Sequence, residues 1–238
     1  MKKSMEIKDI RKYGDKERAK NLSRFFKTGK GEYGEGDKFL GLTVPTCRSL
    51  VKELLDISDK DLENILTSSY HEERLIALLI LVKRFEKSKD EKTRKEIYSY
   101  YLSHTKYINN WDLVDLSAPR IVGKYLIDKK DKEKILLKLA ISKLLWERRI
   151  AVLATSIFIY EKDPGITFKL VDLLMKDKED LMHKACGWML REIGKKCGED
   201  ILKKYLKDRY MTMPRTMLRY SIEKFDETTR KLYLNSKI

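Results

Sequence analysis

Trp111 and Asp115 place an aromatic ring and a carboxylate in one short run of sequence, NWDLVD at residues 110–115. Residues four apart in a helix share one face, and Asn109 or Asn110 is a suitable residue to begin that helix. A ring face beside a carboxylate attracts a cationic group by cation–π and charge interactions. The competing interpretation is structural, with Trp111 packed in a core and Asp115 paired with a neighbouring arginine.

The two other tryptophans of the chain also stand near charge. Trp146 lies three residues before Arg149, and Trp188 lies three residues before Arg191. Helices that stack in register would bring Arg149 and Trp188 to the same inner surface as Trp111. For Trp146, packing between repeats is the alternative interpretation.

The elements that must position these side chains are helices. Apolar residues recur at i, i+3 and i+4 along most of the chain, whereas alternation typical of strands is essentially missing. Ser58 begins a run with the pattern of a capping box. We therefore predict an all-α protein, with later helices at residues 132–141, 144–160, 166–175, 181–193, 201–206 and 217–225.

Similar stretches recur along the sequence, around Arg74, Arg149 and Lys184. A period of about 35–45 residues built from helix pairs is typical of an α-solenoid. Hydrophobic residues make up 42% of the chain, enough for one sizeable core, and no Pro/Gly/Ser-rich linker divides it. We expect a single HEAT-like repeat domain over residues 1–238, with a concave basic groove suited to a long partner.

The charge balance favours a polyanionic partner. Fifty-two Lys and Arg residues against 37 Asp and Glu residues leave a net charge of +15, and cations gain free energy by replacing the counterions of phosphates. Membrane surfaces and acidic proteins attract such charge as well. The longest apolar run, Leu75 to Val82, is far too short to span a bilayer, and no signal-peptide pattern opens the chain.

Three scattered cysteines without a CxxC pair favour reduced thiols in a cytoplasmic protein. Neither they nor the three histidines have the spacing of metal ligands. We therefore predict no metal and no cofactor.

A glycine-rich segment from Gly29 to Gly41 contains five of the eleven glycines, and residues 29–34 match GxGxxG. A dinucleotide-binding loop needs a strand before it and a helix after it. Here a basic helix is expected before the segment and a polar loop after it, which disfavours nucleotide binding. The segment is then either a structural connection or a flexible loop whose lysines reach phosphate, namely Lys27, Lys30 and Lys38.

Several of these motifs together resemble the DNA alkylation repair glycosylases of the AlkD type. They are NWDLVD at 110–115, the Trp146–Arg149 element and KACGWMLRE at 184–192, with FLGLTVP at 39–45 and MPRTMLRYSIEK at 213–224. The resemblance extends from about residue 20 to the C-terminus. It implies a monomeric HEAT-like solenoid that holds duplex DNA and hydrolyses the N-glycosidic bond of N3- or N7-alkylated purines.

Position by position, Trp111, Asp115, Arg149 and Trp188 match the functional residues of that family. An alkylated purine is cationic and leaves without a general acid, so Asp115 is expected to stabilise the developing oxocarbenium charge. Trp111 and Trp188 are expected to stack on the deoxyribose, and Arg149 to hold a phosphate. The sequence shows no evident pocket for a flipped base, and the resemblance implies that extrusion is not required. Further DNA contacts are predicted at Lys27, Lys30, Lys38, Arg48, Arg148, Lys184, Arg191, Arg215 and Arg219.

Three departures from the family pattern matter. Arg148 precedes Arg149 directly, the segment Gly29–Gly36 is absent from the best-known member, and Phe25 stands where an aromatic with a hydroxyl can occur. Two other functions stay open. One is a helical module that grips damaged or branched DNA without cutting, and the other is a scaffold for an acidic protein, which leaves Trp111, Asp115 and Trp188 unexplained.

Overall fold

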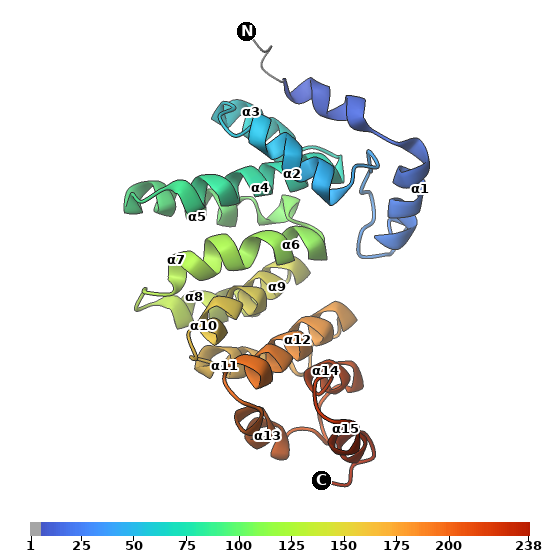
Figure 1. The fold of residues 1–238 in the computed structure, drawn as a ribbon, viewed down its shortest axis with the longest axis vertical. Helices are drawn as coiled ribbons and strands as arrows, with labels where there is room; N and C mark the ends of the chain where they lie inside the picture. The colour runs from blue at the N-terminus through green and yellow to red at the C-terminus, as the bar shows by residue number, and fades with distance from the viewer. Residues whose placement is uncertain (1–5) are drawn as a thin grey trace. The chain divides into compact units, whose positions relative to one another are not determined.

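The computed structural model describes residues 6–238, and this part of the chain is all-helical (Figure 1). Its extended pairing is limited to an isolated bridge between Lys38 and Tyr70. The all-α prediction is therefore confirmed. Residue contacts divide the chain into two compact units, Met1–Ser117 and Ala118–Ile238, each described by itself below. The prediction of a single domain over residues 1–238 stays a prediction.

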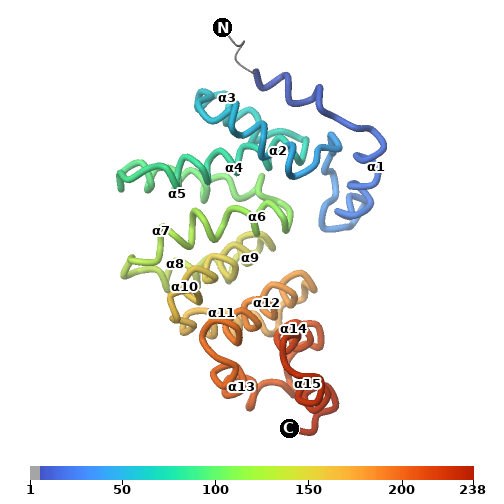
Figure 2. Tube along the Cα trace, viewed as in Figure 1, coloured from blue at the N-terminus to red at the C-terminus, as the bar shows by residue number. Residues whose placement is uncertain are grey.

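The first unit is built around α4, which is apolar on nearly every side. Residues Leu75–Val82 are all buried, and α2, α3 and α5 pack against this helix (Figure 2). A helix that is hydrophobic all round requires neighbours on all sides. The elements of this unit are η1 (Ile7–Tyr13), α1 (Lys16–Phe25), α2 (Val44–Glu53), α3 (Asp59–Leu66), α4 (His71–Lys87), α5 (Glu91–Ser103), η2 (Thr105–Tyr107) and α6 (Trp111–Ala118).

The start of α3 shows how local sequence sets a helix boundary. The Ser58 hydroxyl accepts the backbone N–H of Asp61 at 3.1 Å, which satisfies one of the free donors of the first turn. The predicted helix start at Ser58 is confirmed.

The second unit is a further set of packed helices, in which α12 contacts α9, α11, α13 and α14, and α8 contacts α9. Its π-helical turn η3 directly follows α6. The elements are η3 (Pro119–Gly123), α7 (Lys124–Leu126), α8 (Lys132–Ala140), α9 (Leu145–Ala154), α10 (Ser156–Tyr160), α11 (Gly165–Leu174), α12 (Asp180–Lys196), α13 (Glu199–Lys207), α14 (Arg215–Ser221) and α15 (Glu227–Leu234).

Two predicted helices differ from those observed. The single helix expected over 144–160 is divided into α9 and α10 at Thr155, whose buried hydroxyl donates to the Val152 carbonyl at 2.7 Å. Bonding of a threonine side chain to a preceding carbonyl competes with the helical ladder. The helix expected over 217–225 ends at Ser221.

No helix among residues 6–238 has the length and apolar character needed to cross a membrane. All three cysteines are free thiols, with Cys47 and Cys186 buried and Cys197 half-buried.

Candidate active site

Asn110 directly precedes helix α6, in agreement with the prediction that Asn109 or Asn110 begins it. The Asn110 carbonyl accepts the Val114 N–H at 3.2 Å, and its side-chain oxygen accepts the Trp111 N–H at 2.8 Å. The side chains of Trp111 and Asp115 are both half-buried on this helix. Trp111 is therefore not a core residue, and the helical spacing puts it on one face with Asp115.

Aromatic rings from α1 and the following segment pack around Trp111. The ring of Phe26 stacks on Trp111 with centroids 5.3 Å apart and also on Phe39 at 5.1 Å. Phe25 meets Trp111 edge-on at 6.1 Å and is 64% exposed at the end of α1. The side chain of Trp111 is thus part of an aromatic cluster that the sequence analysis did not foresee.

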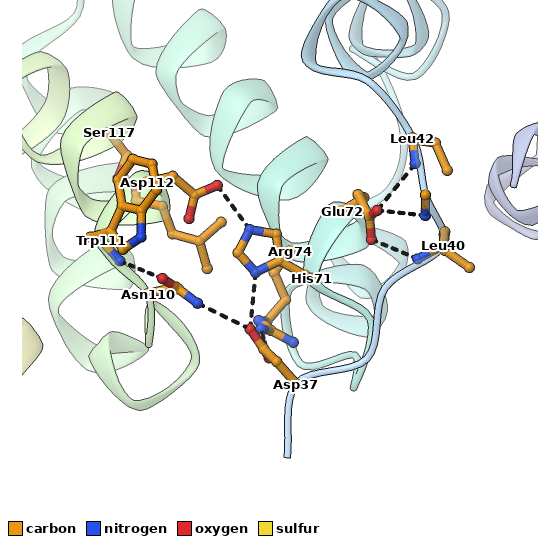
Figure 3. Close-up of polar contacts among 12 residues, drawn as sticks. Asp37, Leu40, Leu42, His71, Glu72, Arg74, Asn110, Trp111, Asp112 and Ser117 are labelled. Carbon is orange, nitrogen blue, oxygen red and sulfur yellow. Dashed lines mark hydrogen bonds and ion pairs between the residues drawn. The ribbon is translucent and has the colours of Figure 1, made fainter. Parts of the chain in front are cut away.

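A group of polar and charged side chains surrounds His71, next to Trp111 (Figure 3). The His71 imidazole is 2% exposed, with Nδ1 at 2.9 Å from Asp37 Oδ2 and Nε2 at 2.8 Å from Asp112 Oδ2. Asp37 also forms a buried ion pair with Arg74 and accepts a long hydrogen bond from Asn110 Nδ2 at 3.5 Å. We call His71, Asp37, Arg74, Asn110 and Asp112 the His71 cluster.

Electrostatics within the His71 cluster favour the charged forms. Burial by itself lowers the pKa of His71, but the hydrogen bonds and charges of Asp112 and Asp37 outweigh it and raise the pKa to about 9. Burial by itself raises the pKa of Asp37, but His71 and Arg74 outweigh it and hold the pKa below its ordinary value. The imidazole is therefore protonated at neutral pH, with a carboxylate on each side.

Asp115 lies near the buried hydroxyl of Tyr101. Burial raises the pKa of Tyr101, and the charge of Asp115 raises it further. The Tyr101 hydroxyl is hydrogen-bonded to Ser117 Oγ at 2.8 Å. Asp115 itself is half-buried. In this setting the electrostatic interaction of its carboxylate with a nearby positive charge is stronger than in water.

The glycine-rich segment is tied to α4. The Glu72 carboxylate accepts the backbone N–H groups of Leu40, Gly41 and Leu42 at 2.9, 2.8 and 3.1 Å. At Gly41, φ is +87° and a Cβ would lie 2.0 Å from the Asp15 carbonyl oxygen, so only glycine fits. The GxGxxG run at 29–34 follows a helix rather than a strand, which agrees with the interpretation against dinucleotide binding.

The side chains of Lys27, just before this segment, and of Lys30 and Lys38 within it are exposed, and so is Arg48 on α2. Lys27 has a positive φ of 52° and turns the chain out of α1. Their roles as phosphate contacts stay predictions, and the choice between a structural connection and a phosphate-binding loop stays open.

In the second unit, the adjacent arginines of α9 have different surroundings. Arg148 donates from Nε and Nη2 to the Asp177 carboxylate at 2.6 and 3.3 Å, and from Nη1 to the Ser142 carbonyl. Arg149 is 5% exposed and donates from Nη1 to the Leu181 carbonyl at 2.8 Å. Trp146 is buried, as expected for a residue that packs between helices.

Trp188 is half-buried on α12. At the neighbouring Gly187, a Cβ would lie 2.5 Å from the Met217 carbonyl oxygen and 2.5 Å from Tyr220 Cβ. Helix α14 therefore approaches the backbone of α12 beside Trp188, and the absence of a side chain permits that approach.

The remaining predicted DNA contacts of this unit are partly engaged within the protein. Lys184 pairs with Asp180 at 2.7 Å, and Arg191 pairs with Glu223. Arg215 donates to the Leu234 carbonyl at 2.9 Å. Arg219 is exposed on α14.

The first unit thus contains Trp111 and Asp115, and the second contains Arg149 and Trp188. Alignment of the two sets along one surface stays a prediction. The sequence analysis missed the His71 cluster and Phe26, although Asp112 stands inside the NWDLVD run and Phe26 follows Phe25 directly. Among residues 6–238, no group of three or more His, Cys, Asp or Glu side chains is arranged to hold a metal ion.

The fold and these residues define an all-α protein of helical-repeat type, and comparison with known proteins gives the family. The model of the family described as DNA alkylation repair enzyme matches residues 7–225, so the chain belongs to that family. Among solved structures, a protein described as "Predicted DNA alkylation repair enzyme from Enterococcus faecalis" matches with a TM-score of 0.68, at 16% identity, over 90% of this chain and 97% of that chain. At this identity the likeness shows the fold. None of the curated proteins matches.

Proposed function

We propose that the protein is a monofunctional DNA glycosylase that removes N3- and N7-alkylated purines from duplex DNA by hydrolysing the N-glycosidic bond. The observation that carries this proposal is the half-buried Asp115 carboxylate, one helical turn after the half-buried Trp111 on α6, in a DNA alkylation repair enzyme. An aromatic face and a carboxylate together favour a cationic substrate.

The chemistry requires little from the protein beyond electrostatics. When the bond between C1′ and the purine nitrogen breaks, its electron pair neutralises the positive charge of the alkylated base. Positive charge then develops on the deoxyribose, where Asp115 stabilises it. A water oxygen adds to C1′ and loses its proton, which leaves an abasic site and the free base. No general acid is needed.

Binding of the DNA follows from the remaining residues. Trp111 offers a partly exposed ring to the sugar beside the lesion, and Phe25 extends that aromatic surface. In the second unit, Trp188 is proposed to stack on the DNA and Arg149 to hold a phosphate through the guanidinium plane. The net charge of +15 favours the duplex at long range. We further propose that the protein acts as a monomer in the cytoplasm and uses no metal or cofactor.

The test is release of 7-methylguanine from methylated duplex DNA. We expect Asp115→Asn to lower the rate by orders of magnitude while DNA affinity stays within a few-fold, because the carboxylate acts mainly on the developing charge. Asp128→Asn, the same change at an exposed position, is the control and should release base at the wild-type rate.

Two results would overturn the proposal. If the wild-type protein binds methylated duplex DNA but releases no base, the protein is a DNA-binding module. If Asp115→Asn retains the full rate, the carboxylate does not carry the chemistry.

A further inference from the structure

We propose that His71, as an imidazolium, is a positioning residue that holds the start of α6 and so orients Trp111 and Asp115. The role assigned to those two side chains rests on the proposed glycosylase function. His71 itself contacts neither of the predicted site residues through its polar atoms, and it acts through Asp112 and Asp37.

With both carboxyl groups ionised, the hydrogen-bond geometry requires a positive charge on His71. Both ring nitrogens lie within 3 Å of a carboxylate oxygen, at 2.9 Å for Asp37 and 2.8 Å for Asp112. A carboxylate can only accept, and a neutral imidazole has one donor. Two such contacts are satisfied together only when both nitrogens carry hydrogen. The ring also packs against Phe26 and Phe39, with centroids 4.9 and 4.7 Å away.

Three successive residues at the start of α6 depend on this arrangement. Asp112 is bound by His71 directly. Asn110 donates to Asp37, which His71 holds in place, and Asn110 in turn accepts the Trp111 N–H. The Trp111 ring stacks on Phe26, which also packs on His71. A change at the His71 ring therefore reaches Trp111 by both the backbone and the aromatic cluster.

The charged and titratable groups around His71 come from four elements. Asp37 comes from the glycine-rich segment, Asp112 from α6 and Arg74 from α4, and Arg74 also donates to the Ser68 carbonyl. Cys47 of α2 lies nearby, where burial and the charges of Glu72 and Asp112 raise its pKa to about 12. Within the His71 cluster, the cations His71 and Arg74 balance the carboxylates Asp37 and Asp112. Loss of the His71 proton leaves one uncompensated negative charge in this cluster, next to Trp111.

The contacts that hold the first turn of α6 should therefore depend on pH. At pH values well below about 9, the imidazolium holds both carboxylates. As the pH passes about 9, one of the two contacts loses its hydrogen, and either the half-buried Asp112 or the buried Asp37 is left as a carboxylate that faces a nitrogen lone pair. We expect the environment of the Trp111 ring to change at that pH.

Fluorine NMR on protein labelled with 5-fluorotryptophan tests this directly. The three tryptophan resonances are assigned by single Trp→Phe variants. In the wild-type protein, the Trp111 resonance should shift with a midpoint near pH 9, while those of Trp146 and Trp188 stay constant. In His71→Gln, which is neutral and donates to only one carboxylate, the Trp111 shift with pH should disappear.

A matched control is His104→Gln, because His104 lies on the same unit and pairs with Glu63 instead. It should keep the wild-type titration of Trp111. If His71→Gln does not fold, Asp112→Asn provides the second variant, with the midpoint of His71 followed by the carbon resonance of its ring. Removal of that carboxylate should move both the His71 and Trp111 midpoints to lower pH together.

The inference is overturned if the Trp111 resonance is constant from pH 6 to pH 10, or if it titrates equally in His71→Gln. Neither outcome depends on base release. A titrating Trp111 in a protein that releases no base supports the positioning role and removes the glycosylase function. An insensitive Trp111 in an active glycosylase removes only the positioning role.

Discussion

Trp111 and Trp188 are both half-buried, yet the molecule holds them in different ways. The Trp111 segment is held by the charged side chains of Asp37 and His71, which are distant in the sequence, together with the adjacent Asn110. Trp188 is placed by close contact of two helices at Gly187. The first arrangement responds to charge and protonation, and the second responds to side-chain volume. Two residues proposed for similar roles therefore differ in the perturbations that should move them.

Asp37→Ala is expected to have the largest effect. It removes the acceptor of His71, Arg74 and Asn110 and leaves one buried positive charge uncompensated, so the free energy of unfolding should fall by about 3–5 kcal/mol. Urea unfolding measures this value. Asp128→Ala, at an exposed carboxylate, should change it by less than about 0.5 kcal/mol. A loss below about 1 kcal/mol for Asp37→Ala would show that the His71 cluster is not strongly stabilising.

Gly187→Ala should have the next largest effect, confined to the second unit. The new Cβ would meet the Met217 carbonyl and Tyr220, and overpacking of this kind costs about 1–3 kcal/mol. Urea unfolding measures the cost, and the Trp188 fluorine resonance should shift while that of Trp111 does not. At the control position Gly165, the nearest atom is 3.5 Å from a new Cβ, so Gly165→Ala should be tolerated. Equal stability of the two variants would contradict the close approach.

The pH dependence of the free energy of unfolding should also distinguish the surroundings of Trp111 from those of Trp188. The pKa of His71 is raised from 6.5 to about 9, so its stabilising contribution is full below about pH 6.5 and lost as the pH rises through about 9. We expect the urea midpoint of the wild-type protein to fall between pH 6.5 and pH 9.5. The fall should be smaller in Asp112→Asn and unchanged in Gly187→Ala. An equal fall in Asp112→Asn would assign the pH dependence to other groups.

The smallest expected effect concerns phosphate contacts in the second unit. Arg219→Ala removes an exposed cation of α14, which should weaken duplex binding uniformly and lower the slope of log affinity against log salt by about 1. Lys207→Ala removes an exposed cation of α13, outside the predicted contacts, and should leave the slope unchanged. Equal slopes for Arg219→Ala and the wild type would remove Arg219 from the DNA-binding surface.

Much of the helical fold follows from local patterns. The 3.6-residue periodicity located α8, α11 and α12, and Ser58 and Asn110 marked the starts of α3 and α6. The division at Thr155 was missed because its hydroxyl bonds to a carbonyl within an otherwise continuous apolar pattern. The His71 cluster was missed because its contacts join residues 34 and 41 positions apart, and no local spacing indicates such a pairing.

The sequence by itself determined the helices, the common face of Trp111 and Asp115 and the basic charge, because helical periodicity and capping depend on residues within a few positions of each other. Tertiary structure alone decided that Trp111 is half-buried among Phe25 and Phe26, that Arg148 pairs with Asp177, and that the His71 ring is positively charged at neutral pH. Burial and charge pairing depend on which distant segments meet, and a buried group takes the charge that its neighbours stabilise.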